Sequence, residues 1–244
     1  MKKFLPIFLF LIGALVLAGV YFFIIKGKKA ESGENSDDAL TEVPFEKRPV
    51  VSLTPTSDGH FLTLKVDKIK IAATSLDYEL LYSVSAGSTQ GVPGTISLDG
   101  QSQIERRLLL GSESSGKFRY DEGVEGGSLT LRFRNTQGKL VAKFSTDFRL
   151  LSDTESLASS DGKFSVNLGK KAEAFFVVME TFGVPQVPSA DVISGPYGVF
   201  TPSEVVGGGS VKVEGAPLRW TGEDWTQDFG GEAFGLGIFV GTSS

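Results

Sequence analysis

The sequence lacks cysteine entirely and contains a single histidine, His60. Without thiols the chain cannot form disulfides, use a cysteine nucleophile, bind zinc through cysteine or carry a lipid on a lipobox cysteine. One histidine excludes a histidine-rich metal site but leaves one imidazole for acid–base chemistry. A catalytic histidine needs a nucleophile and an orienting acid nearby, and His60 follows an Asp-Gly turn in a context typical of an exposed loop. We therefore predict that the chain is not an enzyme.

Basic residues are scarce beyond the N-terminal 29 residues. That segment holds five of the 24 Lys and Arg residues and no acid, so the rest of the chain has 19 bases against 29 acids. A body with this excess of negative charge repels phosphate backbones and anionic surfaces. Nucleic acid is therefore not a predicted partner.

One long run lacks charge altogether. Residues 4–25 form 22 uncharged positions, which as a helix would span about 33 Å and match the hydrocarbon core of a bilayer. We predict a transmembrane signal-anchor helix over 4–25 after a cytoplasmic tail of residues 1–3, so that the lipid bilayer is the first partner. The predicted flanks of the helix are Lys2, Lys3, Lys26, Lys28 and Lys29.

Two alternatives concern this segment. A signal peptidase could cleave after Ala18, although the seven further uncharged residues favour a retained anchor. Lysines on the two sides are nearly balanced, so charge alone does not orient the helix, but long following domains are translocated largely regardless of nearby charge. We predict a single-pass plasma-membrane protein with its bulk extracytoplasmic, at the cell surface.

The remainder is predicted to be mainly β. Residues 26–48 are polar and acidic, as in a solvated linker. Over residues 49–150, apolar and polar residues alternate, for example at Leu62, Leu64 and Val66, as in half-buried antiparallel strands. Asn135–Gly138 is a predicted hairpin turn. These features resemble single-pass, signal-anchored bacterial surface proteins with immunoglobulin-like or fibronectin-type β-sandwich domains, and the resemblance implies a sandwich over 49–150.

The C-terminal part is predicted to be a second, smaller β-rich domain over 163–244, after a polar linker at 151–162. Its most apolar stretch, Phe175–Phe182, fits a central strand covered on both faces. The competing interpretation is a helix over Lys170–Thr181, because KKAEAFFVVMET also contains helix formers.

Few motifs suggest chemistry. Gly111–Lys117 spells GxxxxGK, but Phe118 stands where a phosphate-binding loop needs Ser or Thr, and no helix start follows. We interpret it as a serine-glycine turn, and the Ser114/Lys117 spacing as incidental, because that pairing needs a helix. Acids cluster at Asp121–Glu125 and at Glu223, Asp224 and Asp228; calcium binding is an alternative there to solvated loops, and we predict no cofactor.

Aromatic residues provide the candidate contacts. Tyr197 and Trp225 lie in the glycine-rich C-terminal part and are predicted to touch a protein or glycan ligand, whereas Trp220 is predicted to be core. The predicted function is a non-catalytic surface module for adhesion, envelope organisation or complex assembly. One alternative is a glycan hydrolase using the acids Glu223, Asp224 and Asp228. The other is an accessory subunit of a membrane complex, packing through the small residues of the helix.

Overall fold

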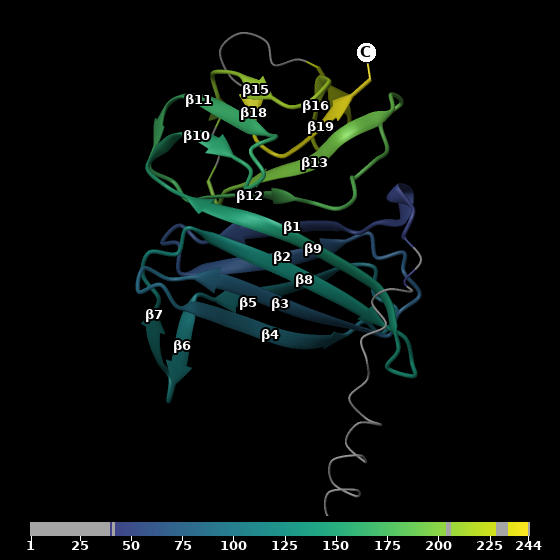
Figure 1. The fold of residues 1–244 in the computed structure, drawn as a ribbon, viewed down its shortest axis with the longest axis vertical. Coiled ribbons are helices and arrows are strands. Elements are labelled where there is room, and N and C mark those ends of the chain that lie inside the picture. The colour runs from purple at the N-terminus through teal and green to yellow at the C-terminus, as the bar shows by residue number, and fades with distance from the viewer. Residues whose placement is uncertain (1–39, 41, 204–205, 228–233, 244) are drawn as a thin grey trace, which may run out of the picture. The chain divides into compact units, whose positions relative to one another are not determined.

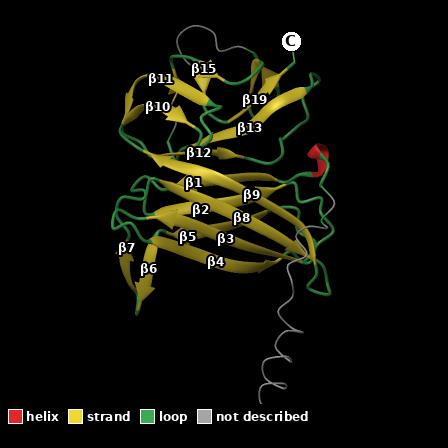
Figure 2. Ribbon diagram, viewed as in Figure 1, coloured by secondary structure: helices red, strands yellow, loops and turns green. Residues whose placement is uncertain are grey.

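The computed structural model describes residues 40, 42–203, 206–227 and 234–243. Residues Glu42–Ser244 form one compact unit, called the body below. Within the described residues, the body consists of antiparallel strands and one short 3₁₀ helix, η3 (Phe45–Lys47) (Figures 1 and 2). None of the described helices is long and apolar enough to cross a membrane. The predicted helix over residues 4–25 lies outside the described part of the chain.

The first half of the body holds nine strands. They are β1 (Val50–Pro55), β2 (Phe61–Asp67), β3 (Ser75–Ser83), β4 (Thr89–Ser97), β5 (Ile104–Leu109), β6 (Gly111–Ser114), β7 (Lys117–Tyr120), β8 (Gly126–Arg134) and β9 (Leu140–Leu151). The described strands of the second half are β10 (Thr154–Ala158), β11 (Ser165–Ala172), β12 (Phe176–Glu180), β13 (Val192–Phe200), β14 (Val206–Gly207), β15 (Val211–Lys212), β16 (Ala216–Trp220), β17 (Trp225–Thr226), β18 (Phe234–Gly235) and β19 (Ile238–Thr242).

Two sheets enclose the first core. One has the order β1-β2-β5, and the other consists of β9-β8-β3-β4, which is part of a nine-stranded sheet. The alternation predicted from the sequence is confirmed: Leu62, Leu64 and Val66 of β2 are fully buried, and the residues between them are partly exposed. They share a core with residues of β3 and β8 such as Leu80 and Leu131, so the two sheets face each other.

The predicted hairpin turn at Asn135–Gly138 is confirmed. It joins β8 to β9, which pair from Gly126↔Arg149 to Arg134↔Leu140. Asn135 Oδ1 accepts hydrogen bonds from the backbone N–H groups of Gln137 and Lys139, both at 3.0 Å. Asn is suited to such turns because its short side chain can replace a backbone acceptor.

Strand β12 joins the two halves of the body. It pairs with β9 on one side and with β13 on the other, inside the sheet ordered β17-β16-β19-β13-β12-β9-β8-β3-β4. Val177 and Met179 point into the first core, whereas Phe176 and Val178 point into a second core. The central strand predicted within Phe175–Phe182 is therefore confirmed, and the helix considered for Lys170–Thr181 is wrong. A continuous apolar run is suited to a central strand because both faces of such a strand are buried.

The second core lies between β12, β13 and β19 and the smaller sheet β10-β11-β15. Figure 1 shows the two halves of the body on either side of β12. The predicted linker at 151–162 contains the end of β9 and all of β10. The nine-stranded sheet is continuous from one half to the other, because β9 is the neighbour of β12. At the other end, residues 42–48, predicted as linker, belong to the body, with Val43 packed on the first core.

Adjacent valines of β12 provide a test of whether the two cores unfold together. Val177→Ala and Val178→Ala each remove about two methylene equivalents, one from each core, and we expect each to lower the free energy of unfolding by about 1–3 kcal/mol. Because one strand serves both cores, each variant should shift a single transition, measured by denaturant unfolding of the full chain with circular dichroism and tryptophan fluorescence. Ile193→Ala, at a side chain that is 52% exposed, is the control and should change stability by less than about 0.5 kcal/mol. Two separate transitions would instead support independent domains over 49–150 and 163–244.

Candidate functional site

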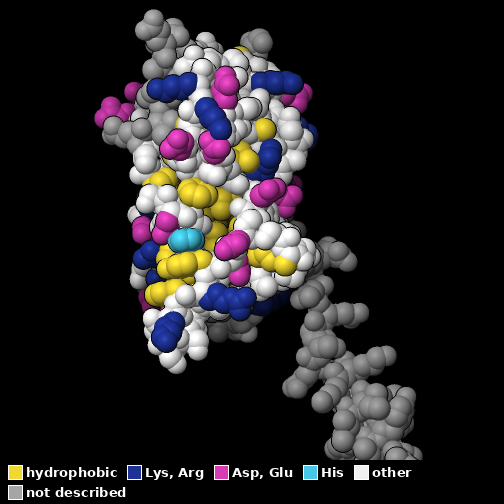
Figure 3. Space-filling view, turned by 90° about the vertical axis from the view of Figure 1, so that its left-hand side faces the viewer, with side chains coloured by type: hydrophobic (Ala, Val, Ile, Leu, Met, Phe, Trp, Pro, Cys, Tyr) yellow, Lys and Arg dark blue, Asp and Glu magenta, His cyan; other side chains and the backbone are white. Residues whose placement is uncertain are grey.

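A cleft of about 570 Å³ opens at one end of the body. It lies between the β1–β2 turn, the β7–β8 loop, the end of β9 and the segment before β12. Figure 3 looks onto this side: hydrophobic side chains lie above and below the single histidine, with Asp and Glu side chains beside it. The lining residues are Asp58, Gly59, His60, Asp121, Glu122, Gly123, Val124, Glu125, Arg149, Leu150, Leu151, Ser152 and Phe175.

The β1–β2 turn, residues 56–61, is held by its own side chains and is called the first Asp-Gly turn below. Thr56 Oγ1 donates to Asp58 Oδ1 at 2.5 Å and accepts from the Phe61 N–H at 3.1 Å. Asp58 Oδ1 also accepts from the His60 N–H at 3.1 Å. Gly59 has a φ of 71°, which favours glycine, and its N–H donates to the Thr56 carbonyl. The turn therefore fixes the Asp58 carboxylate at the cleft.

The same turn occurs a second time between β10 and β11, at residues 159–164, called the second Asp-Gly turn. Ser159 Oγ donates to Asp161 Oδ1 at 2.5 Å and accepts from the Phe164 N–H at 3.1 Å. Asp161 Oδ1 accepts from the Lys163 N–H at 3.0 Å, and Gly162 has a φ of 70°. Both turns read Ser-Asp-Gly-x-Phe in the sequence, at 57–61 and 160–164.

The two turns differ in what covers them. In the second turn the Tyr197 hydroxyl donates to Asp161 Oδ2 at 3.1 Å, and its ring stacks on Phe164 at 5.0 Å between centroids. Although burial opposes the effect, hydrogen bonds from Ser159, the Lys163 N–H and Tyr197 lower the pKa of Asp161. Burial, together with the bond to Asp161, raises the pKa of Tyr197 to about 12. In the first turn the Asp58 side chain is 53% exposed.

The carboxylate of Asp58 is stabilised in its charged form. Hydrogen bonds from the Thr56 hydroxyl and then from the His60 N–H lower its pKa to about 2. Its second oxygen, Oδ2, lies 3.1 Å from His60 Nδ1. The aspartate therefore presents a fixed negative charge at the rim of the cleft over the physiological pH range.

The β7–β8 loop, residues 121–125, supplies the other acids and is called the acidic loop. The Tyr82 hydroxyl donates to Asp121 Oδ2 at 2.9 Å, and burial together with this bond raises the pKa of Tyr82. The Glu122 carbonyl accepts from the Ser85 N–H, and the Glu125 carbonyl accepts from the Leu150 N–H. The backbone of the loop is thus tied down, while the Glu122 and Glu125 carboxylates form no ion pair with any described residue.

An aromatic ledge adjoins the cleft and consists of His60, Phe61, Phe118 and Tyr120. The His60 and Tyr120 rings stack at 3.8 Å between centroids, and the Phe118 ring is parallel to Tyr120 at 6.1 Å. Phe61 meets both of the latter rings edge-on. The Arg107 guanidinium lies 3.7 Å from the Phe61 ring centroid, a close cation–π contact. Phe118 remains 48% exposed and Tyr120 37% exposed.

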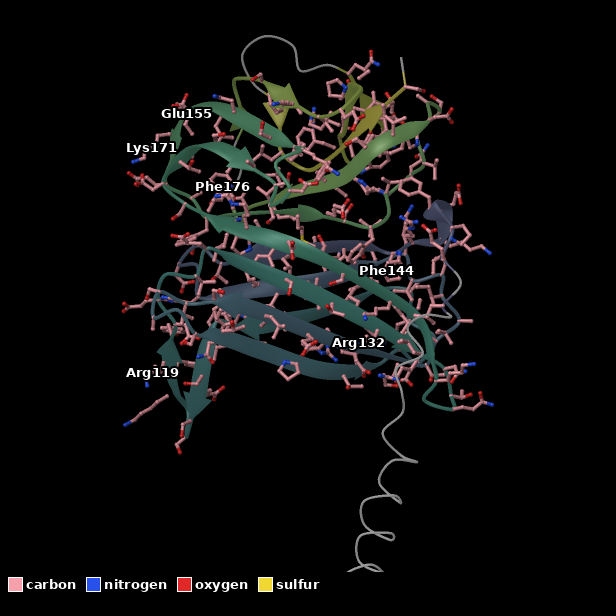
Figure 4. The ribbon with its side chains drawn as sticks, in the orientation of Figure 1. Arg119, Arg132, Phe144, Glu155, Lys171 and Phe176 are labelled. Atoms are coloured by element: carbon pink, nitrogen blue, oxygen red, sulfur yellow. The ribbon has the colours of Figure 1, made fainter. Side chains whose placement is uncertain are left out.

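The GxxxxGK motif forms the β6–β7 hairpin that carries this ledge. Gly111 pairs with Tyr120 and Ser114 with Lys117, so the predicted serine-glycine turn is confirmed, and the motif is followed by a strand rather than a helix. Alternate residues of β7 face opposite sides, which places Phe118 on the ledge, while Arg119 extends away from the body (Figure 4).

The aromatic contacts predicted from the sequence lie elsewhere. Tyr197 is 3% exposed and its ring stacks on Phe164 in the second core, so little of this side chain is available to the predicted ligand. Trp225 is half-buried against the small cluster of Val184, Leu218 and Val240. Its ring meets Trp220 edge-on, and its Nε1 donates to the Gln186 carbonyl at 2.6 Å. Its polar edge is already occupied, which leaves it a weak candidate for ligand contact.

The acids considered for glycan hydrolysis do not form a pair in the described residues. Glu223 and Asp224 lie exposed in a turn whose N–H groups bond to Thr221 Oγ1, and Asp228 lies outside the described residues. In the described part of the chain, no group of three or more His, Asp or Glu side chains is placed to hold a metal ion.

One other hollow brings carboxyl groups together. Asp161 and Glu180 line a pocket of about 100 Å³, and burial, followed by the negative charge of Asp161, raises the pKa of Glu180. A pair with opposed pKa shifts is typical of acid–base sites. Here the space is well below the roughly 300 Å³ at which ligand pockets begin, and Asp161 is tied to the second Asp-Gly turn.

At this end of the body, fixed negative charges, an apolar floor and exposed rings lie side by side. The acids at Asp121–Glu125 and the Asp-Gly turn before His60 were identified from the sequence, whereas the contacts of Phe118, Tyr120 and Phe175 were missed. The repeat of Ser-Asp-Gly-x-Phe also indicates that the two turns share one structure. Nothing local indicated Phe175, which reaches the cleft because β12 pairs with β9.

No protein family matches this chain, and no curated protein or solved structure is detectably similar to it.

The hydrogen bond within the first Asp-Gly turn predicts a titration that carbon-13 NMR of the carboxyl groups can follow. Asp58 should titrate near pH 2, and Thr56→Val should move its midpoint toward the ordinary aspartate value near 3.9, whereas Thr56→Ser should leave it low. Because the folded-state pKa is depressed, the stabilisation is complete above about pH 3.9 and is lost as the pH falls toward 2. An Asp58 midpoint near 3.9 in the unsubstituted chain would contradict this assignment.

Proposed function

We propose that this chain is a membrane-anchored, extracytoplasmic binding module that contacts a protein partner and performs no chemistry itself. The uncharged run over residues 4–25 supports the anchor. The acidic cleft and the aromatic ledge support the binding role. Aromatic side chains are enriched at the centres of protein interfaces, and exposed apolar side chains gathered in one place mark interaction sites.

The strand order supports a sandwich of the immunoglobulin and fibronectin class for the first half of the body. In that class the first, second and fifth strands share one sheet, and the third and the last two share the other. Strands β1, β2 and β5 correspond to the first set, and β3, β8 and β9 to the second, with β4 added beside β3. Loops at the ends of such sandwiches commonly carry binding sites, and the cleft lies at one end.

The single observation that carries the proposal is the exposure of Phe118 and Tyr120 beside a cleft of about 570 Å³. The arrangement of the rings favours a polypeptide over a glycan. Sugars stack on open ring faces, but the Tyr120 ring is stacked with His60 at 3.8 Å between centroids and lies parallel to Phe118 at 6.1 Å. Part of the ring surface is therefore already used within the ledge, which favours insertion of the exposed rings among the side chains of another protein over flat stacking on a sugar.

The topology can be tested by protease treatment of intact cells that express the full chain. We expect externally added protease to remove the body, detected by blotting for residues 49–244, because the domain would lie outside the membrane. The cell-associated material should resist extraction with alkaline carbonate before proteolysis, as an integral anchor requires. Full protection of the body in intact cells would reverse the orientation, and release by carbonate would indicate cleavage of the anchor.

The binding surface can be tested by photocrosslinking in the same cells. With p-benzoylphenylalanine in place of Phe118, we expect a discrete crosslinked species of higher mass, because the ledge would contact the partner. The matched control places the same probe at Ile193, another exposed apolar side chain, where no such species should form. Equal crosslinking at both positions, or none at 118, would remove the ledge from the proposed interface, and catalytic turnover by the purified chain in a hydrolase screen would remove the non-catalytic role.

A further inference from the structure

The charge and shape of the cleft define the chemistry of the partner more closely. We infer that the cleft takes a basic segment of a polypeptide, with a Lys or Arg head group among the carboxylates and apolar neighbours on the floor and the ledge. This inference rests on the proposed function and specifies which kind of protein segment the same surface recognises.

Negative charge dominates the cleft. Its lining includes four carboxylates, and Arg149 is the one Arg or Lys among the described lining residues. The four acids differ in how they are used within the body. Asp58 and Asp121 accept hydrogen bonds from Thr56 and Tyr82, whereas Glu122 and Glu125 form no ion pair with any described residue. Two carboxylates are thus available to a cation, beside two that are already fixed in place.

The apolar lining suits the stems of basic side chains. Val124, Leu150 and Phe175 contribute carbon surface between the acidic loop and the first Asp-Gly turn. Lys and Arg place three or four methylene groups along such surfaces while the charged head reaches oxygen ligands. Phe175 is held firmly because it packs on the first core and leads directly into β12. A short cation without a hydrocarbon stem would leave this part of the cleft unused.

The second Asp-Gly turn shows how a turn of this kind is covered by a side chain from another strand of the body. In the second Asp-Gly turn, the Tyr197 hydroxyl donates to Asp161 Oδ2 while its ring stacks on Phe164. In the first turn the corresponding Oδ2 of Asp58 meets only the neighbouring His60 within the described residues, and the carboxylate remains half exposed. A donor from another chain could reach Asp58 from the cleft, as Tyr197 reaches Asp161 from β13.

Other occupants fit less well. Phosphorylated ligands and anionic lipid head groups would face four carboxylates, and like charges placed together oppose binding. A free polyamine would satisfy the acids but would not use the exposed Phe118 and Tyr120 rings. These alternatives give different results in the test below.

The test measures fluorescence anisotropy of a labelled peptide with the full chain in an uncharged detergent. The probe is acetyl-Leu-Lys-Phe-Lys-Leu-amide, and the matched peptide carries Glu in place of both Lys residues. We expect the Lys peptide to bind and the Glu peptide not to bind. Affinity for the Lys peptide should fall as salt rises from 50 to about 300 mM, because exposed charge pairs are screened over about 10 Å at 0.1 M salt.

Two double variants assign the binding to the cleft. Glu122→Gln with Glu125→Gln should weaken the Lys peptide by about fivefold, as expected for the loss of two partly exposed charge pairs. Glu155→Gln with Glu214→Gln changes the net charge equally at exposed positions outside the cleft lining and should leave affinity within about twofold. Both double variants should melt within about 2 °C of the unsubstituted chain, since all four side chains are exposed.

The outcomes separate this inference from the proposed function. Failure of the Lys peptide to bind, equal binding of the Glu peptide, or equal loss in both double variants would overturn the basic-segment inference alone. Displacement of the peptide by an equimolar polyamine would assign the acids to small cations and overturn it too. If the probe at position 118 still crosslinks to a partner in cells, the proposed binding function stands after each of these results. Absence of that crosslink overturns the proposed function, whatever the peptide does.

Discussion

Burial of both faces of β12 is the constraint on which the rest of the body depends. Its four apolar residues alternate between two cores, so the strand cannot move without exposing side chains on one side or the other. Burying a side chain of this size stabilises a fold by about 1.5–3 kcal/mol, and here the contributions fall on both sides of one strand. Since β12 pairs with β9 and β13 together, the nine-stranded sheet is continuous through it. The two halves of the chain are therefore linked by a shared strand rather than by a surface contact.

The position of the cleft follows from this strand. Phe175 immediately precedes β12, and Leu150 and Leu151 end β9, its neighbour in the sheet, so register alone brings these residues to one end of the body. Across from them, the acidic loop is fixed by the Glu125 carbonyl, which accepts the Leu150 N–H. The cleft thus consists of loops whose ends are set by paired strands, so its lining is ordered by the body itself.

Local features of the chain were predictable, and features that depend on distant pairing were not. The alternation of Leu62, Leu64 and Val66 identified a half-buried strand because only one face of that sheet meets a core. Composition did not distinguish the buried Tyr197 from the exposed Tyr120, since exposure depends on which sheet covers each ring. Likewise, the GxxxxGK segment was correctly interpreted as a turn, but its aromatic ledge arises only when β7 folds beside β2. The pattern of apolar and polar residues shows which side chains of a strand share a face. Which other element buries that face depends on tertiary contacts.

The two Asp-Gly turns differ in which residue after the turn is the first to point into the core, and this difference leaves an aromatic ring exposed after the first turn. Both turns have the same hydrogen bonds and end in phenylalanine, yet Phe164 points into its core, whereas after Phe61 it is Leu62 that points inward. Successive side chains of a strand face opposite sides, so this one-residue difference leaves Phe61 on the outer face of its sheet. An aromatic ring there is favourable only if something shields it, and Arg107, Phe118 and Tyr120 do so in part. The incomplete shielding is what leaves ring edges exposed beside the carboxylates, and a partner with a basic, apolar segment would complete it as Tyr197 completes the second turn.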